Sequence, residues 1–471
     1  FETLAPVLTL GGRYGMSDVY RGQAAVVEYS SPNVAKHLHA GHIRSTIIGH
    51  VLSNIYQAAG YTVHRINYVN DWGGFGFLLE GYARWKDEFP TATSKNDLLY
   101  SIYMRYREME KLVVQEEHSS ADMGREYEDF MKSSRERFNR LEAGDPAELE
   151  LWSQMVGWSL EEFNEFYALL GIYQDYLIGE SYYAPKGDAL VGAALANGKA
   201  ELHEGAASVV LGEEERLVIR RSDDSTIYAT RDLAGIKDRI ETFDPSVLSI
   251  VVGEEQTDYF SKIFRAAKHL GLLDEKKVTL KHISFGLYIN AETKKKLASR
   301  EGATNVIHLL QLAEAHFRGA YHKRTEFTDA EKESNAKILA IGSIAFNDVK
   351  KDRRFPVEFA SNPLEVVKEF EESGGAYVMY TVARARSIVR KSGGQVPPPA
   401  TVMPEKLEAL EVMLIKRINQ FSDTILRAVE TDNPAVVAGY ALELARDYNS
   451  YYEACAVMEA GVVKYPYRLV I

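Results

Sequence analysis

The spacing of apolar positions changes twice near the start of the chain. Residues 24–29 are a Val-rich run ending in an aromatic residue, which favours a β-strand. Residues 43–59 carry apolar side chains at three- and four-residue intervals, which predicts a helix, and residues 62–69 alternate as a second strand. A strand, a helix and a strand of these lengths make a right-handed βαβ unit, so we expect a parallel sheet.

Later segments extend this α/β pattern. Residues 82–173 are long, charged and helical in spacing, and they predict helices inserted into the sheet domain. Residues 208–211 and 215–220 predict strands, and the apolar run 247–252 is typical of a strand buried in a parallel sheet. We therefore expect an α/β nucleotide-binding domain over residues 24–300, with a helical insertion at about 82–200.

The last third of the chain is helical in pattern almost throughout. Segments of helical length with apolar stripes predict an antiparallel bundle. They are residues 336–346, 363–372, 377–391, 404–431 and 434–458. We expect a connecting helical segment over 301–362 and a separate helical domain over 363–471. Residues 1–23 show little periodicity and are interpreted as a linker from an upstream region, because the chain begins at Phe1 without a Met.

Composition narrows the class of protein. Apolar residues make up 46% of the 471 positions and the formal net charge is −12, which disfavours indiscriminate binding to nucleic acid. No apolar run approaches the length that spans a bilayer. The single Cys455 excludes an internal disulfide and argues against a Cys-based zinc site, so a reducing compartment such as the cytosol is expected.

A candidate phosphate site lies between the first strand and the first helix. The turn carries His39 and His42 in the form His-x-Gly-His, with Lys36 before them and Gly41 between them. A helix N-terminus offers free N–H groups to a phosphate, and these side chains add further donors. Gly41 would let the backbone approach a nucleotide closely. The alternative is that both histidines are merely solvated on a loop.

Two further stretches carry candidate chemistry. The basic, glycine-containing loop 294–304 could close over a triphosphate, although such a charge run is usually a solvated surface. Residues 227–230 are expected to end a strand, after which Asp232 stands near the start of a helix. Asp232 would then lie at the ligand edge of the sheet, or would simply cap the helix.

The sequence resembles a known family at several of these places. Residues 30–49, SSPNVAKHLHAGHIRSTIIG, resemble the ATP-site signature of class I aminoacyl-tRNA synthetases in the form used by the arginyl enzymes. Tyr228-Ala229-Thr230-Arg231-Asp232 is similar to their arginine-pocket motif, and residues 374–388 resemble the start of their anticodon-binding domain. The resemblance extends over about residues 24–471 and implies a Rossmann-like catalytic domain followed by an all-α anticodon-binding bundle.

The resemblance implies an activity and its substrates. Such enzymes activate L-arginine with ATP, accompanied by Mg²⁺, and transfer it to tRNA(Arg). No membrane association is implied, and we expect a cytoplasmic monomer. The loop 294–304 is a degenerate form of the family's mobile Lys-Met-Ser-Lys-Ser signature, and Lys36 stands where the arginyl enzymes supply the missing lysine.

The resemblance also implies site residues. The catalytic candidates are Lys36, His39, His42 and Arg300, and the ATP-binding candidates are His39, Gly41, His42, Ser299 and Arg300. The arginine-binding candidates are Glu28, Asn33, Tyr228, Asp232 and Gln256. The candidates for tRNA binding are Arg353, Arg354, Arg384, Arg386 and Arg390, and no metal-ligating residue is predicted.

Some positions depart from the family pattern and leave alternatives open. Phe75 stands where a Gln is expected, and Ala298 lies in the signature loop. One alternative is a diverged, arginine-containing cyclodipeptide synthase that uses arginyl-tRNA and a second aminoacyl-tRNA. Another is a non-catalytic tRNA-binding paralogue, which would tolerate loss of the histidine pair that this chain retains. Family members usually end with one more helix than this chain shows after Val463.

Overall fold

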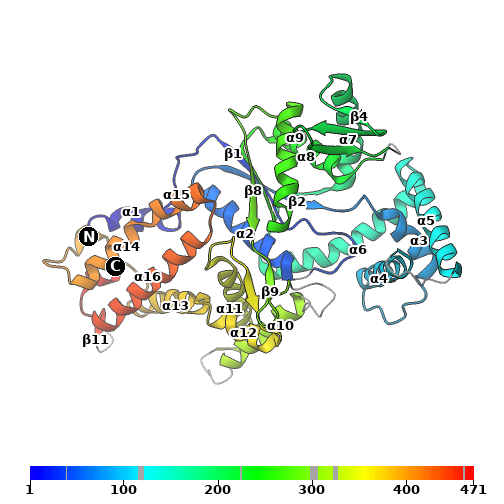
Figure 1. The fold of residues 1–471 in the computed structure, drawn as a ribbon. Helices are drawn as coiled ribbons and strands as arrows, with labels where there is room; N and C mark the ends of the chain where they lie inside the picture. The colour runs from blue at the N-terminus through cyan, green and yellow to red at the C-terminus, as the bar shows by residue number, and fades with distance from the viewer. Residues whose placement is uncertain (39, 115–120, 223–224, 297–305, 322–326, 460–461) are drawn as a thin grey trace.

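The computed structural model is built on a five-stranded sheet in the order β3-β2-β1-β7-β8, with every neighbouring pair parallel (Figure 1). It describes residues 1–471 except 39, 115–120, 223–224, 297–305, 322–326 and 460–461. The strands are β1 (Ala24–Glu28), β2 (Thr62–Val69), β3 (Tyr176–Gly179), β7 (Pro245–Gly253) and β8 (Thr279–Phe285). This arrangement confirms the predicted α/β class with a parallel central sheet.

Helices cover both faces of the sheet, which explains why β1 is apolar at nearly every position. Ala25 and Val27 are buried with α2 (Ala40–Ala58), while Val26 is buried toward α9 (Thr257–Leu270) on the opposite face. Helix α2 lies close to its strand because Gly49 has no side chain. A Cβ added there would lie 2.2 Å from the Cβ of Tyr29.

The strand order reverses at β1 and β7, which are neighbours in the sheet but far apart in sequence. Ligands of open α/β sheets bind at such a switch point, outside the carboxyl ends of the strands. The end of β2 is fixed nearby, because the Asp71 carboxylate accepts hydrogen bonds from both the backbone N–H and the hydroxyl of Ser181, each 2.8 Å long. The β1–α2 loop and the β7–α9 connection therefore share one edge of the sheet.

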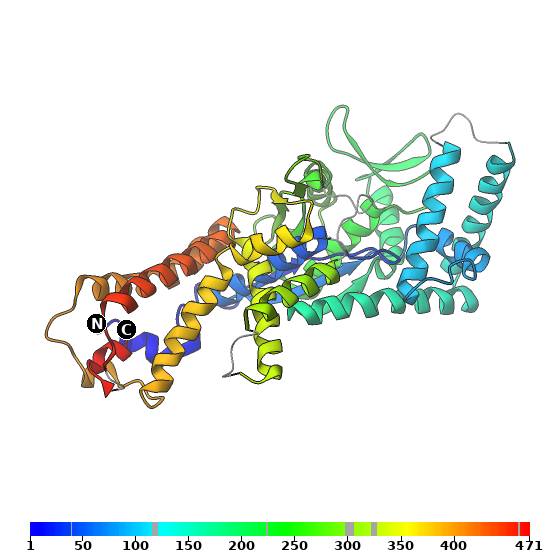
Figure 2. The same ribbon diagram turned by 90° about the horizontal axis from the view of Figure 1, so that it is seen from below.

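A helical insertion extends from the sheet on the side opposite the C-terminal bundle (Figures 1 and 2). Its helices are α3 (Phe75–Trp85), α4 (Lys95–Val114), α5 (Ala121–Glu142) and α6 (Pro146–Leu170). Helix α6 starts where Asp145 accepts hydrogen bonds from the amides of Ala147 and Glu148, and it ends at Gly171 in a left-handed conformation.

The helical insertion ends earlier in the structure than the predicted boundary at about residue 200. The helices stop at Leu170, and β3 returns the chain to the edge of the central sheet before α7 (Glu180–Ala196) begins. Strand β3 has only four residues, with half of them exposed, so its apolar pattern was too short to indicate a strand. An antiparallel sheet of β4 (Glu201–His203), β5 (Ala206–Val210) and β6 (Arg216–Arg220) follows.

Residues 227–230 were predicted to end a strand, but in the structure they begin a helix. Tyr228 already belongs to helix α8 (Tyr228–Phe243), and the N–H of Ile227 donates to the hydroxyl of Thr230, 3.2 Å away. This capping contact satisfies an N–H group that would otherwise lack a partner, and it outweighs the strand preference of Ile and Tyr. Asp232 is therefore in the second turn of the helix and does not cap it.

Helices complete the rest of the chain. Helices α10 (Val306–Tyr321), α11 (Asp329–Val349) and α12 (Pro363–Glu371) contribute to the core cluster that also contains residues of α2 and α6. A short parallel pair, β9 (Tyr288–Asn290) and β10 (Val357–Phe359), lies beside them. The C-terminal bundle contains α13 (Gly375–Lys391), α14 (Ala409–Asn419), α15 (Phe421–Thr431) and α16 (Ala435–Ala454), followed by β11 (Met458–Glu459) and β12 (Val462–Val463).

The N-terminal residues are packed and do not form an extended linker. Helix α1 (Leu4–Leu10) buries Leu4 in one cluster with Ile415 and Val470, so the two ends of the chain lie together on the bundle (Figures 1 and 2). None of the helices that the structure describes contains an apolar stretch of the length needed to span a lipid bilayer.

Candidate active site

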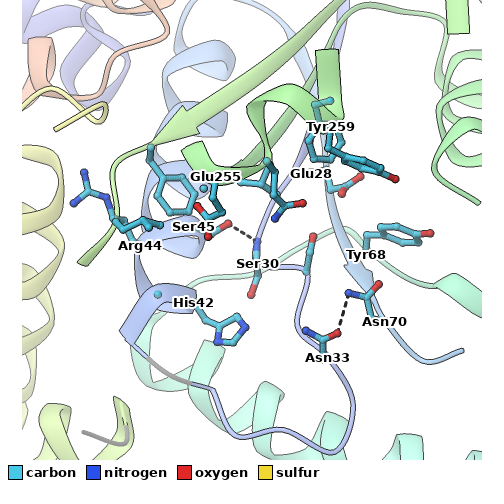
Figure 3. Close-up of a pocket in the computed structure, with 18 of the residues that line it drawn as sticks. Glu28, Ser30, Asn33, His42, Arg44, Ser45, Tyr68, Asn70, Glu255 and Tyr259 are labelled. Carbon is cyan, nitrogen blue, oxygen red and sulfur yellow. Dashed lines mark hydrogen bonds between the residues drawn. The ribbon is translucent and has the colours of Figure 1, made fainter. Parts of the chain in front are cut away.

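A cavity of about 460 Å³ lies at the carboxyl ends of β1 and β7, where the strand order reverses (Figure 3). The structure brings most of the predicted ligand-binding residues to its lining. These are Glu28, Asn33, Gly41, His42, Tyr228, Asp232 and Gln256. They come from β1, the β1–α2 loop, the first turn of α2, the start of α8 and the β7–α9 connection, so one cavity joins both halves of the sheet.

One end of the cavity is acidic. Asp232 on α8 accepts a 2.5 Å hydrogen bond from the hydroxyl of Tyr259 on α9. Glu28 is 4% exposed and is ion-paired with the buried Arg239. In the part of the chain that the structure describes, no Lys, Arg or His lies within ion-pair distance of Asp232, so a neutral phenol is the partner of this carboxylate.

Burial determines how these acids titrate. Loss of hydration raises the pKa of Asp232 to about 7, with the neighbouring Glu28 and Glu180 adding to the rise. The pKa of Glu28 is also raised by burial, although Arg239 opposes the shift. Arg239 and Arg231 are already paired with Glu28 and Glu180, which leaves Asp232 as the acid of this cluster without an ion-pair partner among the described residues. This end of the cavity therefore suits a cationic ligand.

The other end of the cavity is formed by the β1–α2 loop and the N-terminus of α2. Gly41 and His42 are in the first turn of that helix, and the positive end of the helix dipole favours an anion there. The hydroxyl of Ser45 accepts from the N–H of Ser30 at 3.1 Å and donates to the carbonyl of Val251 at 2.8 Å (Figure 3). The loop is thereby attached to both halves of the sheet.

The β1–α2 loop contains non-glycine residues in the left-handed conformation. They are Ser30 with φ 73°, Ser31 with φ 48° and Ala35 with φ 61°. Side chains accept the N–H of each: Ser45 for Ser30, Asn67 for Ser31 at 3.2 Å, and Ser159 for Ala35 at 3.0 Å. Such conformations are unfavourable and persist where the surroundings hold them, often at functional sites.

Other residues that the sequence analysis singled out do not line the cavity or lie outside the described part of the chain. The ammonium group of Lys36 lies 4.9 Å from the ring centre of Tyr103 on α4, and Lys36 is not in the cavity lining. Phe75 is 2% exposed and packs edge-to-face on Trp152, so it belongs to the core. His39, Ser299 and Arg300 are outside the described residues, as is Ala298.

The sequence did not single out several residues that line the cavity. They include Ser30, Ser31, Tyr68, Asn70 and Tyr259. Lys296 also lines the cavity, and it belongs to the basic loop 294–304 that was predicted to close over a triphosphate. Its ammonium group lies 2.7 Å from the carboxylate of Glu255. Tyr259 follows Gln256 by three residues, but only the packing of α9 beside α8 brings it to Asp232.

Most of the arginines predicted to bind tRNA are exposed, but one is not. Arg384, Arg386 and Arg390 are exposed on α13, although Arg384 also lies 4.8 Å from the ring centre of Tyr452. Arg354 is exposed and paired with Asp352 at 2.7 Å. Arg353 differs, because its guanidinium donates to the carbonyls of Ser284 and Asp432 inside the protein.

No metal centre is evident in the described part of the chain, where no group of three or more His, Cys, Asp or Glu side chains is placed to hold an ion.

Comparison with known proteins gives consistent matches over the whole chain. Residues 3–360 match the family model of the catalytic domain of class I tRNA synthetases (R), and residues 378–469 match the DALR anticodon binding domain. The arginine–tRNA ligase of Clostridium botulinum (strain Loch Maree / Type A3) is 35% identical over 467 residues, covering 98% of this chain and 78% of the relative. That of Streptococcus mutans is 35% identical over 464 residues, covering 97% and 78%.

The fold has a counterpart among solved structures. The arginyl-tRNA synthetase of Thermus thermophilus superimposes with a TM-score of 0.77 at 22% sequence identity, covering 100% of this chain and 82% of that one. At this identity the likeness concerns the fold alone.

Proposed function

The chain belongs to the class I arginyl-tRNA synthetases, and we propose that the cavity at the ends of β1 and β7 is where it joins arginine to ATP. The protein is an arginine–tRNA ligase. The arginine carboxylate attacks the α-phosphorus of ATP, pyrophosphate leaves, and the terminal ribose hydroxyl of tRNA(Arg) then takes the arginyl group from the adenylate as AMP leaves. The protein mainly has to position the reactants and stabilise charge.

The acidic end would receive the arginine side chain. The observation that carries this assignment is Asp232, a carboxylate with a hydroxyl partner from Tyr259 and a pKa raised by burial. A guanidinium is always charged and matches a carboxylate with parallel N–H donors. Binding it would supply the missing counter-charge. Tyr228, which is 66% exposed at the start of α8, would contact the ligand from the rim of the cavity.

The polar residues between the two ends would hold the α-amino and carboxylate groups of arginine. Asn33 and Gln256 supply amides to the lining, and the side-chain amide of Asn70 donates to Asn33 at 3.3 Å, which orients it. Glu28 is next to them, but its ion pair with Arg239 fixes its carboxylate against the sheet. We therefore assign Glu28 to electrostatic attraction of the amino group.

The N-terminus of α2 would receive the phosphates of ATP. Gly41 leaves room for the nucleotide, and His42 would stabilise charge that develops on the α-phosphate. Lys296 at the cavity edge, together with His39, Ser299 and Arg300, would act on the leaving pyrophosphate. Mg²⁺ would enter with ATP, because phosphate oxygens are its preferred ligands. The exposed arginines of α13 would contact tRNA. We also propose that the enzyme is a cytoplasmic monomer.

The test is arginine-dependent exchange of pyrophosphate into ATP, followed by charging of tRNA(Arg). His42→Ala should lower the exchange rate by about 10²–10³-fold, the usual cost of one transition-state donor. His269→Ala, which changes an exposed histidine at the end of α9, is the matched control and should be unaffected. Normal exchange by His42→Ala would remove the phosphate assignment. Cyclic dipeptides formed from arginyl-tRNA without exchange would instead support the synthase alternative.

A further inference from the structure

The β1–α2 loop is connected to the helical insertion by a continuous chain of hydrogen bonds. The N–H of Ala35 donates to the hydroxyl of Ser159 on α6 at 3.0 Å, and that hydroxyl donates to the side-chain oxygen of Asn96 on α4 at 2.6 Å. The amide nitrogen of Asn96 donates to Glu162 at 2.7 Å, and Nδ1 of His37 donates to the same carboxylate at 3.1 Å. These hydrogen bonds therefore connect two positions of the loop, Ala35 and His37, through side chains of α4 and α6.

This network is internal. Ser159 is fully buried, Asn96 is 2% exposed, and the side chains of Glu162 and His37 are 16% and 27% exposed. Each member satisfies a neighbour that would otherwise be a costly unpaired polar group. Because Ala35 is held in the left-handed conformation, the network also maintains a backbone shape that a free loop would rarely adopt.

His37 lies between acidic groups from two helices. Glu162 of α6 faces Nδ1, Asp97 of α4 lies 3.5 Å from Nε2, and the ring of Tyr100 is 4.6 Å away between centroids. Both ring nitrogens therefore face carboxylates, which favours the protonated imidazole and raises its pKa above the ordinary value of 6.5. On the same loop, Lys36 lies against Tyr103 of α4.

We propose that Ser159, Asn96, Glu162 and His37 form a positioning network through which the insertion sets the ATP-binding shape of the β1–α2 loop. None of the four lines the cavity, so they act through the loop and not on the substrate. The inference rests on the proposed assignment of this loop to the phosphates. Its consequence is that a change inside the insertion alters ATP use while leaving the acidic end of the cavity, which α8 and α9 provide, unchanged.

The experiment compares Glu162→Gln and His37→Ala with Glu88→Gln. Glu88 provides a matched control, because it is an exposed acid of the insertion that pairs with Arg105 away from the loop. In the exchange assay, the network variants should lose about 10- to 100-fold in kcat/KM for ATP, as expected for a lost hydrogen bond to a charged group, while KM for arginine stays within about twofold. Glu88→Gln should match the unmodified protein.

A pH series adds a measurement that a purely structural role would not affect. Deprotonation of His37 as the pH rises through its raised pKa removes the charge that holds Asp97 and Glu162, so KM for ATP of the unmodified protein should increase with pH. His37→Ala should lose that dependence. His42→Ala tests the phosphate assignment separately. If His42→Ala is impaired but both network variants behave like Glu88→Gln, the network inference fails and the phosphate site stands. If His42→Ala is also unimpaired, the phosphate assignment fails.

Discussion

The hydroxyl of Tyr259 on α9 donates a 2.5 Å hydrogen bond to Oδ2 of Asp232 on α8, at the acidic end of the cavity. Tyr259→Phe removes the donor that stabilises the carboxylate and frees it to rotate. We expect KM for arginine in the exchange assay to rise about tenfold, in line with one charge-assisted hydrogen bond, with KM for ATP unchanged. Tyr451→Phe removes a hydroxyl from the bundle and serves as the control. Equal KM for arginine in all proteins would contradict the role of Tyr259.

Arginine binding should depend on pH through Asp232. Its raised pKa of about 7 means that the carboxyl group of the free protein is protonated at lower pH, whereas a guanidinium binds the anion. KM for arginine should therefore fall by up to about tenfold per pH unit as pH rises toward 7, and level off above it. Steady-state exchange from pH 5.5 to 8.5 measures this. Asp232→Asn should show a flat profile, and a flat profile in the unmodified protein would be inconsistent with the proposed titration.

Asp232 should also lower the stability of the unliganded protein. Its folded-state pKa is above the ordinary value of 3.8, so the unfolded chain ionises more readily and the cost is complete above pH 7. The shift corresponds to at most about 4 kcal/mol. Asp232→Asn should raise the melting temperature at pH 8, and by less at pH 5. Added arginine should stabilise only the unmodified protein. A variant that melts lower at pH 8 would argue against a strained carboxylate.

The parts of the fold that were predictable have local signals. The βαβ unit followed from apolar spacing, and β2 has the predicted bounds. The predicted arginine-binding residues share one cavity because they follow strands or begin helices at the same edge of the sheet, and their role there stays a prediction. Strand β3 was missed because it has only four residues, two of them exposed, which carry almost no periodicity.

Other residues depended on contacts that no local pattern encodes. Lys36 was expected at the phosphates from its place before the histidines, but Ala35 turns the chain in the left-handed conformation and Lys36 faces Tyr103. Arg353 belongs to a charge run that suggests exposure, yet carbonyls from β8 and the end of α15 accept its donors. Both outcomes depend on segments distant in sequence.

The exposed arginines of α13 should contribute to tRNA binding through charge. Reversing Arg386 and Arg390 to Glu should weaken binding and reduce its dependence on salt, because fewer counterions are released from the RNA. Lys276→Glu, at an exposed lysine before β8, is the control. Arg353 is unsuitable for this test because its loss would break internal hydrogen bonds. Filter binding across a salt series gives both quantities, and an unchanged salt slope would place the RNA surface elsewhere.

The most direct test of the account is substrate selection at Asp232. Exchange is measured in the presence of tRNA with arginine, lysine and citrulline, for the unmodified protein and Asp232→Asn. Lysine has a compact ammonium group without the planar fork, and citrulline has a similar shape without the charge, so it would leave the carboxylate buried beside a neutral group. We predict strong preference for arginine over both, and loss of most of that preference in Asp232→Asn with ATP binding retained. Equal exchange with arginine and citrulline in the unmodified protein would contradict the arginine site.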